Sequence, residues 1–143
     1  EKILNLLQYL LLQMPHYVYL EEAKGSLLYQ KQWKAFEYIL EQCFKMEKSP
    51  LFYAQEMGIS LKHLNRICVK ISGQTLTQVI LTRVVLQAQR MWMLHPKASL
   101  FDVASHLGYL DTAHFSKIFK KYTSMTITAF KKKYRDDKKQ QKA

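Results

Sequence analysis

The sequence predicts an all-α protein in which two helix-turn-helix subdomains are joined by a long linker helix and preceded by amphipathic connector helices. Three observations support this fold class. Glycine and proline are scarce, with four and three residues among 143, which favours helix. A pattern with a period of about fifty residues recurs in the last two-thirds of the chain. Between the two copies lies a helical stretch with a capping signal at its start and a proline after its end.

Residues 1–48 are predicted to be a helical connector or a dimerisation segment. Apolar residues spaced by three and four give residues 2–14 one apolar face. They are Leu4, Leu7, Leu11 and Met14. This stripe fits equally a homodimer through residues 1–14 and packing against another helix or domain. A second helix is expected from about Ser26 to Glu47. Its apolar stripe consists of Trp33, Phe36, Tyr38, Ile39, Leu40 and Phe44.

The first helix-turn-helix is predicted over about 49–74 and the second over about 99–124, because the two segments match in register. Ala54 and Ala104 are small enough to let two helices cross closely. Gly58 and Gly108 follow four residues later and supply the positive φ of a tight turn. The expected caps of the helices in these units are Ser49, Ser60, Ser99 and Asp111.

The linker helix is expected over about 75–95, since Thr75 and Gln78 form a capping box and Pro96 follows its end. Twenty residues at 1.5 Å each span roughly 30 Å, close to the ~34 Å turn of B-DNA. A closing helix is expected over about 127–136, capped by Thr126. Residues 49–136 thus form one predicted domain, and 137–143 a basic tail.

The net charge of +11 lies wholly in residues 49–143, which hold 16 Lys and Arg against five Asp and Glu. Residues 1–48 hold six Lys and six Glu. Such a field attracts polyanions, although a solubilising surface would carry the same charge. Cys43 and Cys68 fall within apolar periodicity and are expected to be buried, reduced thiols. The start shows no signal peptide, and no run of 18 apolar residues occurs. We therefore expect a cytoplasmic protein.

The histidines, cysteines and acidic residues do not show the spacing of a catalytic or metal-binding site. The five histidines share no metal-ligand spacing on one helix face, and the two cysteines are far apart. No phosphate-binding glycine loop, paired carboxylates or activating base for a cysteine is evident. We expect no enzyme activity, no catalytic residue, no metal and no cofactor.

The second unit resembles the DNA-binding region of the AraC/XylS family of regulators. The stretch from Asp102 to Lys121 carries the small residue, the Gly-aromatic turn, the Phe-Ser and the Phe-Lys-Lys of that family. Residues 52–54, 64–66 and 83–88 extend the resemblance to about Leu51–Tyr134. The family's closing Gly-x-Thr/Ser-Pro is altered here to Ser124, Thr126 and Ile127, which leaves the turn geometry open.

The resemblance implies a bacterial transcription regulator, such as an activator, that binds double-stranded DNA sequence-specifically with two recognition helices in successive major grooves. RNA polymerase is a candidate partner, and an effector would bind an N-terminal domain upstream of Glu1. Two rival interpretations are a basic nucleic-acid-binding module without sequence readout and an accessory domain of a larger enzyme. A protein–protein adaptor is a weaker third.

On the first recognition helix, Lys62, Asn65 and Arg66 share a face turned away from the apolar side. Arg suits the O6/N7 edge of guanine and Asn the edge of adenine, and the resemblance implies that these positions face the major groove. The base-contacting candidates of the second helix are Thr112, Ala113, His114, Ser116 and Lys117. The phosphate candidates are Ser60, Lys70, Arg83, Asp111, Lys120 and Lys121.

For any single candidate, an ordinary solvated helix face explains the residue equally well. The lysines at 131–133, 138 and 139 either add affinity without readout or form a frayed, solvated tail. Because only the first helix offers a clear Asn-Arg reading pair, we expect the first unit to discriminate sequence and the second to anchor.

Overall fold

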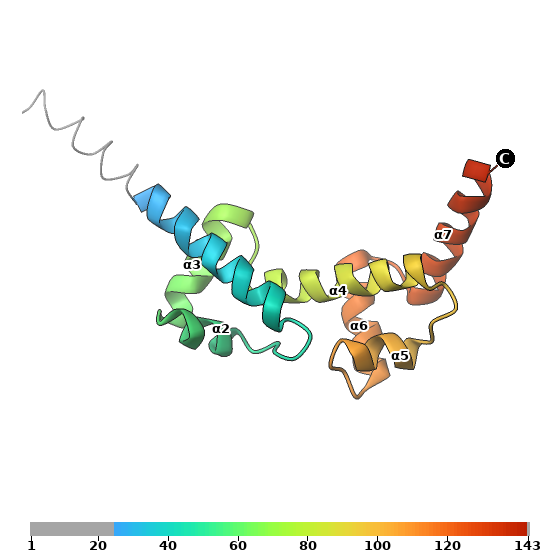
Figure 1. Cartoon of the computed structure of the whole chain (residues 1–143), viewed down its shortest axis with the longest axis horizontal. Coiled ribbons are helices and arrows are strands. Elements are labelled where there is room, and N and C mark those ends of the chain that lie inside the picture. The colour runs from blue at the N-terminus through green and yellow to red at the C-terminus, as the bar shows by residue number, and fades with distance from the viewer. Residues whose placement is uncertain (1–24, 143) are drawn as a thin grey trace, which may run out of the picture.

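The computed structural model describes residues 25–142, and within them every regular element is a helix (Figure 1). A leading helix over residues 25–43 comes first. It is followed by α2 (Pro50–Met57), α3 (Leu61–Ser72), α4 (Leu76–Leu94), α5 (Leu100–His106), α6 (Thr112–Thr123) and α7 (Ile127–Lys142). The predicted all-α class, with two short helix pairs joined by a long helix, is confirmed. The predicted stripe and dimer helix of residues 1–14 lie outside the described residues.

The helix starts follow the capping residues. The Ser60 hydroxyl accepts the His63 N–H, and Thr75 and Gln78 form a reciprocal capping box at the start of α4. The backbone N–H groups of Asp102 and Ala129 likewise donate to hydroxyl oxygens, at 3.0 and 3.1 Å. These acceptors are Ser99 and Thr126. Ser49 departs from its prediction, because it occupies the cap position of α2 without a side-chain capping bond.

Helix α4 runs through both units and ties their cores together. It contacts α2 and α3 of the first unit and α5 and α6 of the second unit. In the first unit it packs with Phe36, Tyr53 and Leu64, which are fully buried. In the second unit the Trp92 ring meets Phe119 edge-on at 5.7 Å between centroids. Such aromatic pairs stabilise by about 0.5–1.5 kcal/mol beyond the apolar area they bury.

Three details of the helices differ from the predictions. The leading helix ends at Cys43 rather than near Glu47, and residues 44–46 form a turn. Tyr38 is 69% exposed, because the buried stripe follows Phe36, Leu40 and Phe44 at intervals of four and Tyr38 falls on the opposite face. Helix α7 continues to Lys142 instead of ending near residue 136.

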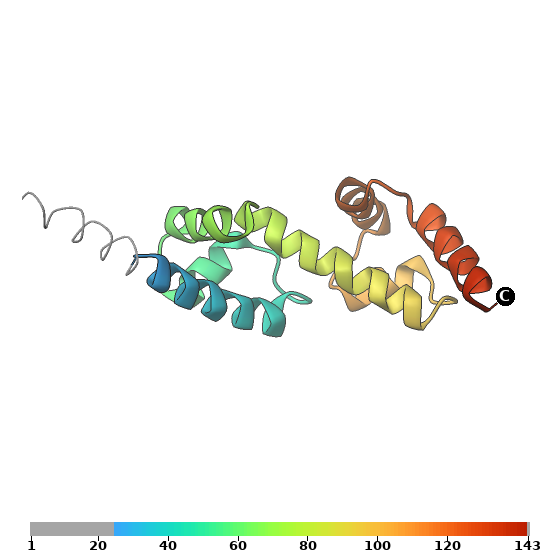
Figure 2. The same cartoon turned by 90° about the horizontal axis from the view of Figure 1, so that it is seen from above.

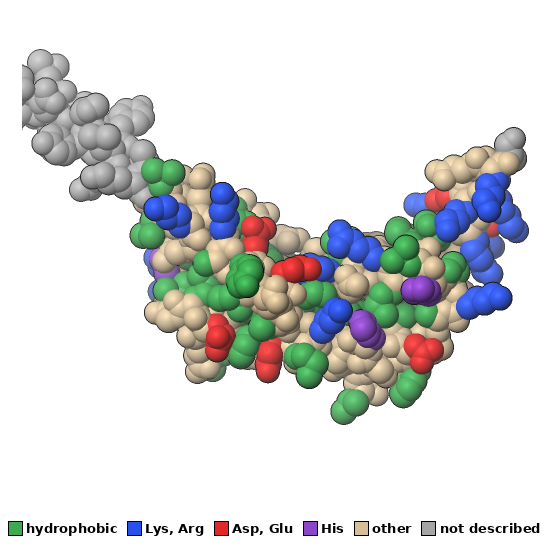
Figure 3. Space-filling view, in the orientation of Figure 1, with side chains coloured by type: hydrophobic (Ala, Val, Ile, Leu, Met, Phe, Trp, Pro, Cys, Tyr) green, Lys and Arg blue, Asp and Glu red, His purple; other side chains and the backbone are tan. Residues whose placement is uncertain are grey.

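The two recognition helices, α3 and α6, lie on the same side of α4, and the leading helix lies on the opposite side beside the first unit (Figure 2). Figure 3 shows the face that carries the leading helix, with acidic side chains scattered over it and Lys and Arg gathered along α7. None of the helices in residues 25–142 is long and apolar enough to cross a membrane.

Candidate nucleic-acid interface

Helix α3 presents a basic surface to solvent. Its capped first turn and its seam of buried residues leave the positions between them facing outward. Lys62, Arg66 and Lys70 are exposed. Together with Asn65 and Val69 they line one shallow depression of about 530 Å³. The three predicted readers of this helix therefore share one surface.

Asn65 is held more firmly than the prediction implied. It is half-buried, and its Oδ1 accepts a hydrogen bond of 2.9 Å from the N–H of Leu76. That N–H is one of the first-turn donors of α4 that have no partner within the helix. The amide NH₂ of Asn65 is not used in this bond. Asn65 thus joins the recognition helix to the linker helix.

Helix α6 exposes fewer of its predicted readers. Ala113, His114 and Lys117 are exposed, whereas Thr112 and Ser116 are half-buried. The Ser116 hydroxyl donates to the Thr112 carbonyl at 2.9 Å, within its own helix. The His114 ring lies 5.9 Å from the Tyr109 ring. Ala113, His114 and Lys117 are therefore the predicted base-contacting residues of α6 that solvent reaches most freely.

Two of the predicted phosphate contacts have partners within the protein. Arg83 donates from Nε and Nη2 to the Glu41 carboxylate at 2.8 and 2.6 Å, and its guanidinium carbon lies 4.1 Å from the centroid of the Phe44 ring. Arg83 thus fastens α4 to the leading helix. The Asp111 carboxylate accepts the N–H groups of Ala113 and His114, at 2.9 and 3.2 Å. A carboxylate in this place occupies the amides that would hold a phosphate and repels it.

The remaining phosphate candidates keep accessible charges. Lys120 and Lys121 are exposed on the last turn of α6. Lys70 is exposed on α3, with its ammonium 5.5 Å from the centroid of the Tyr29 ring. Ser60 uses its hydroxyl as the cap of α3. These three lysines stay the predicted backbone contacts.

A cleft of about 470 Å³ lies between the two units, beside the first half of α4. Its polar lining includes His114, Lys117 and Lys121 from α6 and one cation that the sequence reasoning missed, Lys48. Lys48 precedes the Ser49-Pro50 start of α2, and no local pattern distinguishes it from a surface lysine. Val69 is exposed between Arg66 and Lys70 and lines the depression on α3 with them, as its helical spacing indicates.

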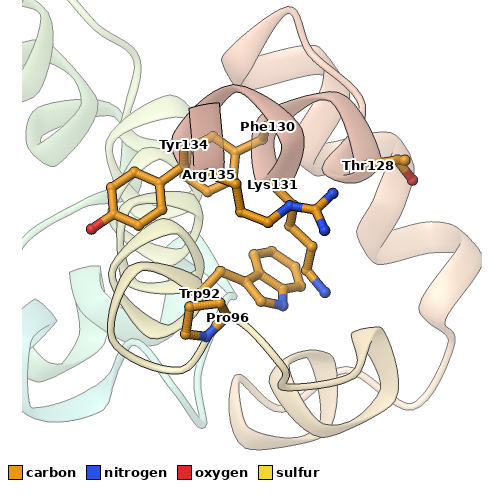
Figure 4. A pocket seen from close by; sticks show the side chains of 7 residues that line it. All are labelled: Trp92, Pro96, Thr128, Phe130, Lys131, Tyr134 and Arg135. Carbon is orange, nitrogen blue, oxygen red and sulfur yellow. The ribbon is translucent and has the colours of Figure 1, made fainter. Parts of the chain in front are cut away.

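At the far end of α4, a smaller pocket of about 210 Å³ separates α4 from α7 (Figure 4). The Lys131 ammonium points over the Trp92 ring, 5.1 Å from its centroid, and donates to the Ala98 carbonyl at 2.9 Å. Trp92 Nε1 donates to the same carbonyl at 3.1 Å. Lys131 therefore connects α7 to the end of α4 and to the turn at Ala98. The interpretation of a frayed tail is wrong for this part of α7.

The cysteines are free thiols with different surroundings. Cys68 is fully buried, and burial raises its pKa to about 11, so it is an inert core side chain. Cys43 is half-buried at the end of the leading helix, less enclosed than predicted. Among the described residues, His, Cys, Asp and Glu form no group that could hold a metal ion.

Comparison with known proteins agrees with this architecture. A family profile described as "Helix-turn-helix domain" matches residues 53–133. The HTH-type transcriptional activator RhaS of Escherichia coli O157:H7 is 34% identical over 82 residues, which are 57% of this chain and 29% of RhaS. The probable transcription factor PqrA of Proteus vulgaris is 32% identical over 78 residues, 54% of this chain and 63% of PqrA. The matched region thus spans less than a third of RhaS and under two-thirds of PqrA.

Two solved structures share the fold. A protein of unknown function from Listeria innocua superposes with a TM-score of 0.59 at 26% identity, covering 70% of this chain and 93% of that one. The C-terminal domain of the response regulator yesN from Fusobacterium nucleatum gives the same TM-score at 20% identity, covering 71% and 95%; at that identity the likeness concerns the fold alone. The chain belongs to the AraC/XylS family and contains the helix-turn-helix region found at the C-terminus of its members.

Proposed function

We propose that this chain is a sequence-specific double-stranded DNA-binding transcription regulator that inserts α3 and α6 into successive major grooves. The observation that carries the proposal is the placement of two capped helices with accessible basic residues on one side of a single linker helix (Figure 2). Helix α4 has 19 residues and spans roughly 28 Å. This length suits two helices that enter grooves about one turn of B-DNA apart.

In this proposal Arg66 reads a guanine edge from α3, and Asn65 offers its NH₂ to a neighbouring base. Ala113, His114 and Lys117 face the second groove. Thr112 and Ser116 have lesser roles there, because they are half-buried. The phosphate contacts are Lys70, Lys120 and Lys121.

The names of RhaS and PqrA describe transcription regulation, and we extend that role to this chain. Such a regulator would act in the cytoplasm. It would contact RNA polymerase if it activates transcription. Homodimerisation through residues 1–14 and control by an effector bound to an upstream domain belong to the same proposal.

Selection on random duplex DNA tests this function directly. The dissociation constant of the chain for the selected duplex should be at least ~10³-fold lower than for a scrambled duplex of equal length and composition. The selected site should contain two half-sites about 10 base pairs apart. Equal affinity for the selected duplex, the scrambled duplex and an RNA of the same length would favour a basic module without readout.

A further inference from the structure

The turn that connects the leading helix to α2 touches both helix-turn-helix units. We call residues 44–49 the elbow. Its first residue, Phe44, is buried in the core beneath Arg83. The hydroxyl of Tyr53 in α2 donates to the Glu47 carbonyl at 2.7 Å. The elbow is therefore held to the first unit at two points, Phe44 and Glu47.

The same elbow reaches the second unit through one side chain. The Lys48 ammonium donates to the carbonyl of Leu107, the C-cap residue that follows α5, and to the carbonyl of Lys45 in the elbow itself. Carbonyls at a helix C-terminus lack partners within the helix and carry partial negative charge, so an ammonium is well matched to them. The ammonium also lies 5.0 Å from the centroid of the Tyr109 ring.

At this contact the backbones of the two units approach closely. Gly108 has φ +81°, and a Cβ placed on it would lie 2.7 Å from Lys48 Nζ and closer still to the Lys45 carbonyl oxygen. Burial lowers the pKa of Lys48 to about 8, which is consistent with an ammonium enclosed at a junction rather than free in solvent. The turn of the second unit thus rests on the elbow of the first.

The turn in contact with Lys48 leads directly into the second recognition helix. The Tyr109 ring packs 5.2 Å from the Phe115 ring and 5.9 Å from the His114 ring, both in the first turns of α6. Tyr109 and Phe115 are buried. A displacement of the Gly108-Tyr109 turn would therefore be passed to the start of α6.

We propose that Lys48 is a positioning residue that fixes the second recognition helix relative to the first, so that the protein accepts its two half-sites at one spacing. A single linker helix leaves two small units able to bend and twist about it. A second connection beside α4 removes that freedom, and rigid placement favours a pair of sites that match it. The spacing aspect rests on the proposed DNA-binding function, whereas the positioning aspect does not.

The first test needs no DNA. Amide residual dipolar couplings of the full 143-residue chain should fit one alignment tensor for α2–α3 and α5–α6 together. In Lys48→Met, the stem keeps its length but loses the ammonium, and we expect the two units to require different tensors. Lys34→Met is the matched control, because Lys34 is an exposed lysine of the leading helix. One shared tensor in Lys48→Met would overturn the proposal.

Folding is checked on the same samples by amide spectra and thermal melting. Lys48→Met removes a partly buried charge and should melt as one folded species. Lys48→Gln, which keeps a donor but is too short to reach Leu107, serves as a second variant and should also show two tensors. If both variants fold and both keep the wild-type tensor, Lys48 has no positioning role.

The second test uses the selected duplex, the same duplex with one base pair inserted between the half-sites, and duplexes with a single intact half-site. We expect the insertion to weaken wild-type binding roughly tenfold and Lys48→Met binding only about twofold. Affinity for each single half-site should be unchanged by the substitution. Equal loss on single half-sites and on the full site would instead make Lys48 a phosphate contact and overturn the inference. If the wild type showed no sequence preference, the proposed function would fail, while the dipolar couplings would still decide the role of Lys48.

Discussion

Asn65 Oδ1 in the first recognition helix accepts a hydrogen bond of 2.9 Å from the N–H of Leu76 in the first turn of the linker helix. The two residues belong to different helices, and Gly73 with φ +72° turns the chain between them. The Asn65 side chain thus contributes both to the proposed DNA-reading surface and to the angle between α3 and α4. The two contributions can be separated because Asn65 uses its oxygen for one and its NH₂ for the other.

Asn65→Asp should separate them. The carboxylate still accepts the Leu76 N–H, so the free energy of unfolding measured in urea should change by less than about 0.5 kcal/mol. The substitution removes the NH₂ donor and adds a negative charge, so affinity for the selected duplex should fall at least about tenfold. Asn65→Ala also loses the hydrogen bond to the Leu76 N–H and should lower the free energy of unfolding by about 1–2 kcal/mol. Unchanged DNA affinity in Asn65→Asp would confine this residue to its structural role.

Arg66 and Lys121 should respond differently to truncation. Arg66→Ala should relax the preference at one base pair of the half-site, costing about 1–3 kcal/mol there and little at other positions. Lys121→Ala should weaken binding to all sequences and lower the slope of log K against log salt by about one. Titrations at several salt concentrations, with a panel of single-base variants of the site, measure both effects. Equal, sequence-blind losses would contradict base readout by Arg66.

Arg83→Met tests whether Arg83 touches DNA at all. Its guanidinium is engaged by Glu41 and covers Phe44, so the substitution should lower the free energy of unfolding by about 1 kcal/mol or less, since Glu41 is 56% exposed. The salt slope of DNA binding should stay at the wild-type value, whereas loss of a phosphate contact would reduce it by about one.

A titration of Glu41 gives a second measurement of the same pair. The hydrogen bond from Arg83 holds the pKa of Glu41 below its ordinary value of 4.5. The stabilisation is therefore fully present above pH 4.5 and is lost as pH falls through the lowered pKa. In Arg83→Met the Glu41 carboxyl, followed by NMR, should titrate closer to 4.5.

The features predicted correctly from sequence are local ones. The caps Ser60 and Ser99 and the Thr75-Gln78 capping box each involve residues three apart, so short sequence patterns reveal them. The turn at Gly58 has φ +65°, as its place after an amphipathic stretch indicated. The internal repeat turned these local signals into a fold prediction.

The contacts that the sequence did not reveal join residues that are distant in the chain. Arg83 meets Glu41 across 42 positions, and Lys48 meets Leu107 across 59. Local patterns carry no information on such pairs, so a lysine or arginine engaged within the protein was indistinguishable from a free cation. The length of α7 was underestimated for a different reason. Its basic end suggested a tail, yet from Ile127 to Lys142 it contains neither Gly nor Pro to end the helix.

Replacing two turn glycines by alanine should have unequal costs. Gly58 and Gly108 both have positive φ, but a Cβ on Gly58 meets no atom of the described residues within 4 Å. Gly58→Ala should therefore cost only about 1 kcal/mol, for the backbone conformation alone. A Cβ on Gly108 would collide with the elbow backbone at Lys45, so Gly108→Ala should cost about 3 kcal/mol. Urea denaturation compares the two variants. Equal losses of unfolding free energy would mean that the elbow backbone at Lys45 moves aside at little cost.

Two buried tyrosines should respond in opposite ways to loss of the hydroxyl. The Tyr53 hydroxyl donates to the Glu47 carbonyl, whereas that of Tyr109 is buried without a hydrogen-bond partner among the described residues. Tyr53→Phe should cost about 1 kcal/mol. Tyr109→Phe should be neutral or stabilising by up to about 1 kcal/mol, because it removes an unsatisfied polar group. Urea unfolding at pH 7 measures both, and a comparable loss in Tyr109→Phe would mean that the Tyr109 hydroxyl forms a stabilising hydrogen bond.

The same pair predicts an alkaline dependence. Burial raises the pKa of Tyr109 from its ordinary 10.0 to about 12, and that of Tyr53 is raised by the same cause. Between pH 10 and about 12 the Tyr109 hydroxyl is ionised in the unfolded chain but still protonated in the folded chain. The stability from this group is therefore fully present below pH 10 and is lost as pH rises through about 12. Tyr109→Phe should unfold at higher pH than the wild type, with a stability difference that widens above pH 10. A constant difference from pH 8 to 12 would show that Tyr109 ionises as readily in the folded protein as in the unfolded chain.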